Sequence, residues 1–372
     1  MNASLNEKLK TVKWGEFKLT DVFTVKNTSN ILAYDIVEGS GTVPYLCASS
    51  ENNAVSTYID YDEKYIEKGN CIFIGGKTFV VTYQEKDFYS NDSHNLALYL
   101  KEGVKSKATL LYMASCVYKS LCQKYSWGNS ISKAKIQDDI ITLPITTDGI
   151  INYEFMESFI AELEAERVTE LSAYLTVSGL DNYELSGKET VIIEKLKKKQ
   201  IPFAEFEFIE VFNNIKQGRR LKKDDQLPGS IPFVMSGTTN TGVVGYISNP
   251  VAEFPKNSIT IDIFGNSFYR NYDFGAGDDT GVYWSTDNKY SKASMLFFTA
   301  AMERTLRGKY SYGEKLRSSQ SLHFKMQLPT KDSKPDYDTM ETLIFAVQKL
   351  VIKDVVIYAD RKIEKTKEVT KR

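Results

Sequence analysis

Two loops in the sequence combine cations, aromatic rings and hydrogen-bonding side chains within a few residues. The first loop contains Lys124, Tyr125, Trp127, Asn129, Ser130 and Lys133, and the second contains Lys309, Tyr310, Tyr312, Lys315, Arg317 and Ser319. Lysine and arginine can bind guanine edges or phosphates, asparagine can pair with adenine, and a good bidentate contact contributes roughly 1 to 3 kcal/mol of discrimination between bases. These loops are therefore candidates for contact with DNA. A purely structural interpretation, in which the tyrosines and the tryptophan belong to the core or to turns, stays open.

Further cations lie outside these two loops. The candidates are Lys26 and Lys77 in the first half of the chain, and Lys216, Arg219, Arg220 and Arg270 in the second half. The run Arg219-Arg220-Leu221-Lys222-Lys223 is more often a solvated loop than a segment that enters a DNA groove. A clamp on the phosphate backbone would nevertheless need little more than such a run.

No set of residues with catalytic spacing stands out. The segment Gly75-Gly76-Lys77-Thr78 invites a phosphate-loop interpretation, but the first glycine of that motif would fall on Cys71. The residues that follow, Phe79-Val80-Val81, predict a strand and not the helix N-terminus that would hold the phosphates. The triplet Asp62-Glu63-Lys64 is expected to be a solvated turn and not part of a nuclease site.

The composition excludes several classes of protein. Lys and Arg number 47 against 48 Asp and Glu, so no global charge attracts the chain to nucleic acid and any such binding must use local patches. The four cysteines form no C-x-x-C pair, and with only His94 and His323 they make a poor zinc set. No apolar run approaches the roughly 18 residues of a membrane span. We expect reduced thiols, a cytoplasmic location and no membrane partner.

The chain repeats itself with an offset of about 185 residues. The loop Lys124-Tyr125-Ser126-Trp127-Gly128 returns as Lys309-Tyr310-Ser311-Tyr312-Gly313. The match extends to Trp14 and Phe203, to Val43-Pro44-Tyr45 and Ile231-Pro232-Phe233, to Asn52 and Asn240, and to Leu143-Pro144 and Leu328-Pro329. A period this long indicates a duplicated domain and not a solenoid. Two like domains in one chain can lie about a pseudo-twofold axis, as in a homodimer.

Each copy is expected to mix helix and strand. The β-branched and aromatic runs Cys71–Ile74, Phe79–Val81 and Ile259–Ile261 predict strands, and the apolar residues near 110–121 and 296–306 predict helices. After each copy comes a longer amphipathic helix, from Met156 with Gly179 as its C-cap and from Met340 onward. The apolar stripe of each long helix needs a partner, and we expect the two helices to pair as an antiparallel coiled coil. A binding face for another protein is the alternative, and both could apply to different sides of the helices.

With its repeated aromatic opening, Pro-containing strands, Leu-Pro exits and trailing helices, the chain resembles a DNA-specificity (S) subunit of a restriction-modification system over nearly its whole length. The resemblance implies an α+β fold with two tandem mixed α/β target recognition domains and pseudo-twofold symmetry. The expected boundaries are residues 1–147 for the first domain, 148–200 for the central spacer helix region, 201–331 for the second domain and 332–372 for the C-terminal spacer helix.

One departure from the common type I sequence pattern indicates which branch of the family the chain resembles. That pattern continues from the domain exit into a Pro-Pro-Leu-x-Glu-Gln-like helix start, whereas this chain continues through Tyr153-x-x-Met156-Glu157 and, in the second copy, Tyr337-x-x-Met340-Glu341. This variant resembles the type IIB-like branch, in which the partner fuses nuclease and adenine methyltransferase in one polypeptide.

The resemblance also implies partners and a division of labour. Double-stranded DNA and methyltransferase or fused methyltransferase-nuclease subunits are the expected partners. S-adenosylmethionine and Mg are expected on those subunits, with no cofactor or metal in this chain, which would be a non-catalytic specificity subunit. Two alternatives stay open at this point: a stand-alone pseudo-dimeric DNA-binding regulator, and a protein with two β-rich modules for a ligand other than DNA.

Overall fold

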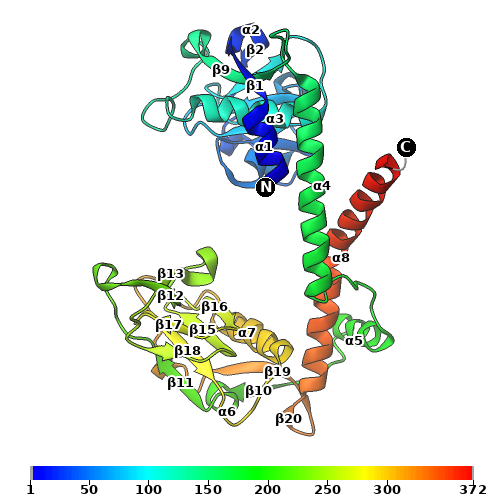
Figure 1. The fold of residues 1–372 in the computed structure, drawn as a ribbon. Coiled ribbons are helices and arrows are strands. Elements are labelled where there is room, and N and C mark those ends of the chain that lie inside the picture. The colour runs from blue at the N-terminus through cyan, green and yellow to red at the C-terminus, as the bar shows by residue number, and fades with distance from the viewer. Residues whose placement is uncertain (1–2, 371–372) are drawn as a thin grey trace. The chain divides into compact units, whose positions relative to one another are not determined.

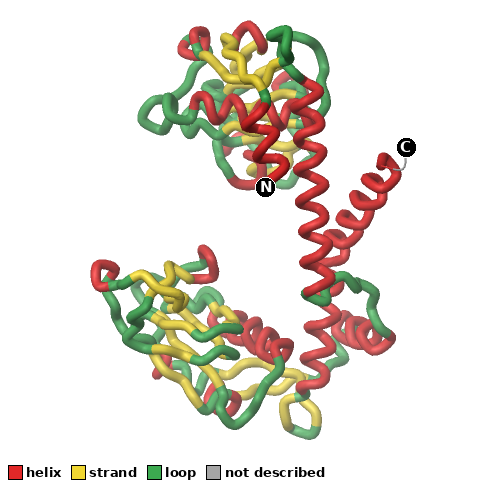
Figure 2. The backbone as a smooth tube through the Cα atoms, in the orientation of Figure 1, coloured by secondary structure: helices red, strands yellow, loops and turns green. Residues whose placement is uncertain are grey.

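The computed structural model describes residues 3–370, with side chains to residue 365. The chain divides into two compact units, Met1–Ala173 together with Ala359–Arg372, and Tyr174–Tyr358 (Figure 1). Both units contain helices, strands and many loops (Figure 2). No helix among the described residues is long and apolar enough to cross a lipid bilayer.

The first unit contains three sheets. Its helices are α1 (Ala3–Thr11), α2 (Leu19–Val22), α3 (Lys107–Leu121), most of α4 (Tyr153–Val177) and the end of α8 (Tyr337–Thr370). Its strands are β1 (Lys13–Lys18), β2 (Phe23–Asn27), β3 (Val43–Leu46), β4 (Val55–Ile59), β5 (Cys71–Ile74), β6 (Val81–Gln84), β7 (Tyr89–Ser90), β8 (Leu96–Leu100) and β9 (Ile140–Ile145). The sheet orders are β1-β9, β2-β8-β5-β6 and β4-β3-β7.

The second unit repeats this plan. Its helices are α5 (Gly187–Lys197), α6 (Phe208–Val211), α7 (Lys292–Leu306) and most of α8 (Tyr337–Thr370). Its strands are β10 (Phe203–Glu207), β11 (Asn214–Gln217), β12 (Pro228–Val234), β13 (Val243–Ile247), β14 (Glu253–Phe254), β15 (Ser258–Asp262), β16 (Ser267–Arg270), β17 (Phe274–Ala276), β18 (Thr280–Trp284), β19 (Lys325–Lys331) and β20 (Lys334–Pro335).

The sheets of the two units correspond strand by strand. The order β11-β18-β15-β16 matches β2-β8-β5-β6, and β13-β12-β17 matches β4-β3-β7. Even the parallel pairing is shared, since β3 pairs in parallel with β7 and β12 pairs in parallel with β17. The duplication expected from the sequence is therefore confirmed at the level of topology.

Alternate side chains of the central strand pack into two different hydrophobic clusters, one on each face of the sheet. On β5, Ile72 and Ile74 belong to the core that includes α3, whereas Cys71 and Phe73 pack in a second cluster with Leu46 of β3. Successive side chains of a strand point to opposite faces, so a strand buried on both faces must be apolar at every position. A helix thus covers one face of the four-stranded sheet, and the smaller sheet covers the other.

The prediction of a strand over Phe79–Val81 is wrong for two of its three residues, because β6 begins only at Val81. Phe79 has a φ of 54°, and its N–H donates to the carbonyl of Gly75 across 2.9 Å. The chain has to reverse between the antiparallel strands β5 and β6, and these residues form that turn. The strands predicted at Cys71–Ile74 and Ile259–Ile261 are confirmed.

The long helices lie where the apolar periodicity predicts them. Helix α4 ends in a Schellman motif, in which the N–H of Gly179 donates to Thr176 and that of Leu180 donates to Leu175. Gly179 has a φ of 65°, which a glycine adopts without a steric cost. Near the end of α8, Lys362 forms an ion pair of 2.9 Å with Glu164 of α4. This contact agrees with a pairing of the two helices, but their antiparallel pairing along a common seam stays a prediction.

A short helix precedes the first strand of each unit, a feature that the sequence reasoning missed. Helix α1 packs on α4, with an ion pair between Lys8 and Glu162. Helix α5 packs on α8, where Ile193 contacts the cluster containing Leu343. The region 148–200, expected to be a spacer helix region, therefore contains α5 in addition to the whole of α4.

Candidate nucleic-acid interface

The two aromatic loops have the same backbone geometry and expose one ring each. In the first unit, Ser126 and Asn129 exchange two backbone hydrogen bonds of 3.2 and 3.0 Å. In the second unit, Ser311 and Glu314 do the same at 3.0 and 3.1 Å. The residue at the tip is Trp127, which is 76% exposed, or Tyr312, which is 82% exposed. Two such exposed rings at corresponding places are available for contact with a ligand, so these two predicted residues are well placed.

Tyr125 is a correction to the predicted set, because its side chain is buried. Its hydroxyl donates to Asp139 Oδ2 across 2.7 Å, and Lys124 forms an ion pair with the other oxygen of the same carboxylate. Burial, together with the hydrogen bond to Asp139, raises the pKa of Tyr125. Tyr125 therefore anchors the base of the loop and does not face a ligand in this structure.

The amide of Asn129 is used within the loop. Its nitrogen donates to the carbonyl of Lys124 across 2.7 Å, and its oxygen accepts from Lys135 Nζ across 2.9 Å. Lys135 also donates to the carbonyl of Ser130. Lys135 was not predicted, and its exposed side chain links Asn129 to Ser130. Lys133 is exposed nearby.

The first aromatic loop is joined to the segment that carries Lys77. The N–H of Ile131 donates to the carbonyl of Gly76 across 3.1 Å. A depression of about 270 Å³ is lined by Ser49, Lys77, Asp92, Trp127 and neighbouring residues. Lys77 and Trp127, which lie 50 positions apart in the sequence, thus share one surface.

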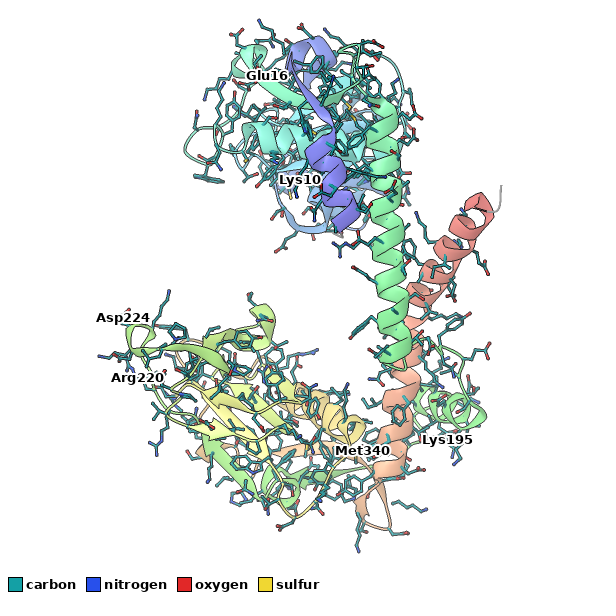
Figure 3. The ribbon with its side chains drawn as sticks, viewed as in Figure 1. Lys10, Glu16, Lys195, Arg220, Asp224 and Met340 are labelled. Carbon is teal, nitrogen blue, oxygen red and sulfur yellow. The ribbon has the colours of Figure 1, made fainter. Side chains whose placement is uncertain are left out.

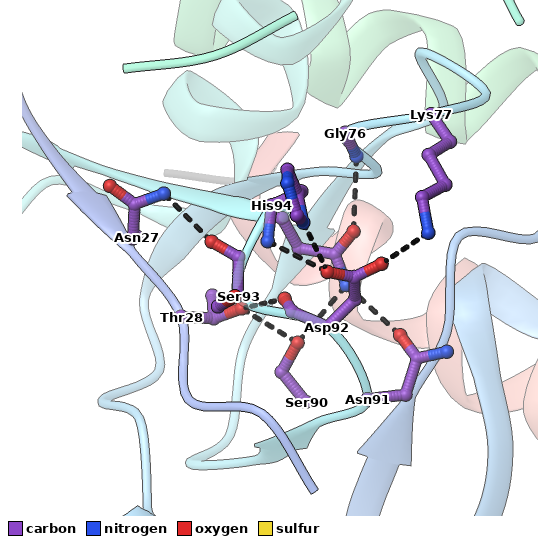
Figure 4. Close-up of polar contacts among 10 residues, drawn as sticks. Asn27, Thr28, Gly76, Lys77, Ser90, Asn91, Asp92, Ser93 and His94 are labelled. Carbon is purple, nitrogen blue, oxygen red and sulfur yellow. Dashed lines mark hydrogen bonds and ion pairs between the residues drawn. The ribbon is translucent and has the colours of Figure 1, made fainter. Parts of the chain in front are cut away.

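Asp92 is the charged centre of this depression (Figure 4). It forms an ion pair of 2.9 Å with Lys77 and accepts from the ring of His94 at 2.7 Å and from the N–H of His94 at 2.9 Å. Burial opposes the ionised form, but the hydrogen bonds from His94 and Lys77 lower the pKa of Asp92 to about 2. The carboxylate therefore stays charged and offsets the charge of Lys77.

Asn95, three residues after Asp92, was also not predicted. Its oxygen accepts from the N–H of Gly76 across 3.0 Å, and its nitrogen donates to Ser90 and Asn91 (Figure 4). The Asn95 side chain is buried and its oxygen and nitrogen both have hydrogen-bond partners, which fixes the segment that presents Lys77. The unbroken polar run Ser90–Asn95 between two strands was the sequence signal for this network.

The second unit builds the same frame with different side chains. The N–H of Leu316 donates to the carbonyl of Ile263 across 3.0 Å, as Ile131 does to Gly76. Asp262 accepts from the N–H groups of Phe264 and Gly237 at 2.8 and 3.1 Å and fixes the neighbouring turns. The two units therefore share the backbone bond between loop and turn, whereas the side chains that fix the turn, Asn95 and Asp262, differ.

The cations of the second loop are exposed. Lys315 lies 4.5 Å from the centre of the Tyr312 ring, a distance typical of a cation–π contact. Arg317 donates to the carbonyl of Asp278, and Lys309 and Ser319 are exposed beside it. Tyr310 is half-buried, and burial raises its pKa.

The basic run of the second unit lies in the connection from β11 to β12. Arg219 and Arg220 are exposed, and Figure 3 places Arg220 at the end of the unit opposite Met340 of α8. Asp224 and Asp225 follow in the same loop and reduce its net charge. Lys216 of β11 lies 5.7 Å from the ring of Trp284.

The prediction that Arg270 contacts DNA is also wrong for this structure. Only 1% of Arg270 is exposed, and its guanidinium donates to Thr260, Thr241 and Tyr272 inside the domain. It therefore cannot reach DNA while the domain is folded in this way. Lys26 of β2 is exposed and lies 5.2 Å from the Tyr99 ring.

Comparison with known proteins agrees with the duplicated architecture. The family model described as the type I restriction modification DNA specificity domain matches residues 11–173 and again 200–353. A curated relative, the specificity subunit S.BcgI of the type II restriction enzyme BgcI from Heyndrickxia coagulans, is 23% identical over 348 residues, which cover 92% of this chain and 96% of the relative.

One solved structure adds a likeness of fold, and a second has a lower score. The S subunit of a type I restriction-modification system from M. genitalium has a TM-score of 0.56 at 15% identity, covering 96% of this chain and 94% of its own. The HsdS subunit from Thermoanaerobacter tengcongensis has a TM-score of 0.33 at 13% identity, covering 94% of this chain and 91% of its own.

Proposed function

Because this chain belongs to the family of type I restriction modification DNA specificity domains, of which it carries two, we propose that it directs a restriction-modification complex to a bipartite DNA target. Each unit reads one half of that target. The observation that carries this proposal is the pair of loops around Trp127 and Tyr312, which share one backbone geometry and differ in their side chains. A shared frame with different contact residues is what two half-sites of different sequence require.

The contact surface would combine exposed rings with local cations. With 47 basic and 48 acidic residues the chain has no general attraction for DNA, so its affinity must come from such patches. Trp127 and Lys133 would serve the first half-site, and Tyr312, Lys315 and Arg317 the second. Lys77 forms an ion pair with Asp92, which offsets its charge. Its contribution would therefore be to position the DNA through one phosphate contact, and not to strengthen the overall attraction for DNA.

The exposed apolar face of α8 supports docking of a large partner subunit. Val347, Val351, Val355 and Tyr358 follow one another at intervals of four and three along one face of the helix, and they are 43%, 73%, 37% and 50% exposed. A continuous apolar stripe that remains exposed in the monomer marks an interaction site. We assign this face to the methyltransferase subunit.

The fused methyltransferase-nuclease is the form of partner that we favour. The departure at Tyr153 and Tyr337 from the common type I pattern motivates this choice, and the likeness to a specificity subunit of a type II enzyme supports it. In this scheme the partner binds S-adenosylmethionine and Mg and performs the chemistry in the cytoplasm. An adenine methyltransferase must flip its base out of the duplex, and the specificity subunit decides which adenine is presented. This chain would act by positioning alone.

A methylation map tests the proposal. DNA from cells with the gene and from cells without it would be compared by single-molecule sequencing, with the partner gene present in both. We expect a bipartite methylated motif that is present only with this chain. A hybrid whose residues 203–330 come from a homologue should change one half of the motif and retain the other, since well-separated contacts add. Binding of duplex DNA without any co-purifying methyltransferase would instead favour a stand-alone regulator.

A further inference from the structure

A turn of rare backbone conformation occurs at the same place in both units. It lies between β3 and β4, where Asn52 and Asn53 have φ/ψ of 46°/40° and 53°/38°. It recurs between β12 and β13, where Asn240 and Thr241 have 47°/37° and 52°/29°. The next residue, Ala54 or Gly242, also has a positive φ. We call these segments, residues 49–54 and 237–242, the left-handed turns.

Maintaining such a turn requires support from the rest of the fold. Consecutive residues with side chains rarely adopt this conformation, because the Cβ atom approaches the following carbonyl oxygen. Asparagine tolerates it better than most residues, and Asn52 and Asn240 both use their amide to donate to the carbonyl three residues ahead, at 3.0 and 3.2 Å. A strained conformation that persists in two copies of different sequence indicates a function served by its shape.

One buried side chain from the neighbouring sheet holds each turn. Gln84, the last residue of β6, donates to the carbonyl of Asn53 across 2.9 Å. Arg270, the last residue of β16, donates to the carbonyl of Thr241 across 2.5 Å and to its hydroxyl across 3.0 Å. Gln84 pairs with the first residue of β5 and Arg270 with the first residue of β15, so the two anchors occupy equivalent positions.

Arg270, which holds the turn of the second unit, is a buried cation. Arg270 donates hydrogen bonds to neutral oxygens, and among the described residues no carboxylate forms an ion pair with it. Burial lowers its pKa, opposed by the hydrogen bond to Tyr272. A buried cation without a counter-ion is costly to fold. Its position directly beneath an exposed turn makes that surface favourable for an anion such as a DNA phosphate.

Both turns lie beside the candidate interface. In the first unit, Ser49 lines the same depression as Lys77 and Trp127. In the second unit, Gly237 donates to Asp262, and the adjacent Ile263 accepts from Leu316 in the loop that carries Lys315. Each turn is therefore tied to the loop that presents the exposed ring of its unit.

Resting on the proposed function, we propose that the left-handed turns are specificity-determining elements that contact bases, with Gln84 and Arg270 as their positioning residues. The tip residues Glu51 and Thr239 occupy the same place in the two copies, and both are exposed. A carboxylate near DNA is repelled by phosphates and is favourable only where it accepts from a base, and its partner in the major groove is the cytosine N4 amino group. Glu51 thus reads a cytosine in one half-site, and Thr239 contacts a base of the other.

Substitution of the tip residues tests this assignment in the complex with its methyltransferase. Glu51→Gln replaces a cytosine-binding carboxylate by an amide that pairs with adenine. We expect the methylation map to change from cytosine to adenine at one position of one half-site, by about 5- to 150-fold in preference. Thr239→Ala should relax one position of the other half-site. The matched control Glu184→Gln, in the exposed segment before α5, should leave the motif unchanged. Glu51→Gln and Thr239→Ala proteins that retain the wild-type motif would overturn the proposal, while the map of the wild type would still establish the function.

The positioning role of Arg270 is tested by giving the second unit the type of side chain that Gln84 supplies in the first. Arg270→Gln installs the side chain that does this work in the first unit, and Arg270→Leu removes every donor. We expect Arg270→Gln to retain discrimination in the second half-site, whereas Arg270→Leu relaxes that half-site alone at a temperature where circular dichroism shows both proteins folded. A folded Arg270→Leu protein with unchanged discrimination would remove the positioning role. If Arg270→Leu does not fold, the tip substitutions still decide the proposal.

Discussion

The backbone N–H of Ile131 donates a hydrogen bond of 3.1 Å to the carbonyl oxygen of Gly76. This one bond joins the aromatic loop to the turn that carries Lys77, and the second unit repeats it between Leu316 and Ile263. Both partners are backbone atoms, so the bond persists when the side chains change. Main-chain atoms therefore keep the contact between loop and turn in both units, which leaves side chains such as Lys77 free to diverge.

Charge reversal in the second aromatic loop should weaken DNA binding. The double variant Lys315→Glu/Arg317→Glu replaces two exposed cations by two anions. Each phosphate that is no longer neutralised makes the negative slope of log K against log salt less steep by about 0.9. We expect an affinity at least tenfold lower for the assembled complex, measured by fluorescence anisotropy between 50 and 200 mM salt. The control is Lys197→Glu/Lys198→Glu at the end of α5, where both lysines lie 3.6 to 3.9 Å from Glu194. Equal small decreases in the two variants would contradict a DNA contact at this loop.

Substitutions at Trp127 and Tyr125, which are only two residues apart, should affect different properties: the first DNA affinity, the second stability. Trp127→Ala removes an exposed ring, so the free energy of unfolding should change by less than about 0.5 kcal/mol while DNA affinity falls. Tyr125→Phe removes the hydroxyl that donates to Asp139 and should cost about 1 to 3 kcal/mol of stability, because hydrogen bonds to charged groups are the stronger ones. Urea denaturation and duplex binding would be measured for both. A destabilised Trp127→Ala protein would mean that its ring packs in solution.

The sequence predicted more of the fold than of the interface. Periodicity and the repeat located the long helices, and Gly179 marked the end of α4, because these features depend on local sequence. The interface could not be obtained in the same way, because the sequence does not show which cations are buried. Arg270 was predicted as a DNA contact but supports a turn, and Asn95, which was not predicted to have a role, is a buried anchor. Both roles depend on tertiary contacts with Thr241 and Gly76 that no local pattern reveals.

Asp92 should make stability depend on pH in acid. Its pKa is lowered from 3.8 to about 2 by hydrogen bonds that outweigh burial, so it binds a proton more weakly in the folded than in the unfolded protein. The stabilising contribution is then fully present above about pH 5 and is lost as the pH falls through 3.8 toward 2. The difference in free energy of unfolding between the wild type and Asp92→Asn should be constant above pH 5 and shrink below it. Urea denaturation at a series of pH values checks this, and a difference that grows in acid would contradict the sign.

The helix that leaves the first unit should set the distance between the half-sites. Four residues inserted after Ala165 add about one turn and roughly 6 Å at 1.5 Å per residue, compared with about 3.4 Å per base pair along a DNA strand. The insertion falls one residue after Glu164, so the ion pair with Lys362 can persist on one side of it while the remainder of α4 is displaced. Because four residues nearly complete a turn, the apolar stripe stays close to its original phase.

We expect the methylated motif of this insertion variant to gain one or two unspecified base pairs between unchanged half-sites. A matched insertion of two residues at the same place would rotate the stripe by about half a turn and should abolish methylation, which separates the length of the helix from its phase. Both variants would be mapped by single-molecule sequencing in the presence of the methyltransferase. An active four-residue variant with the original spacing would show that this helix does not determine the separation, and the pseudo-twofold arrangement of two units on paired helices would then have to be abandoned.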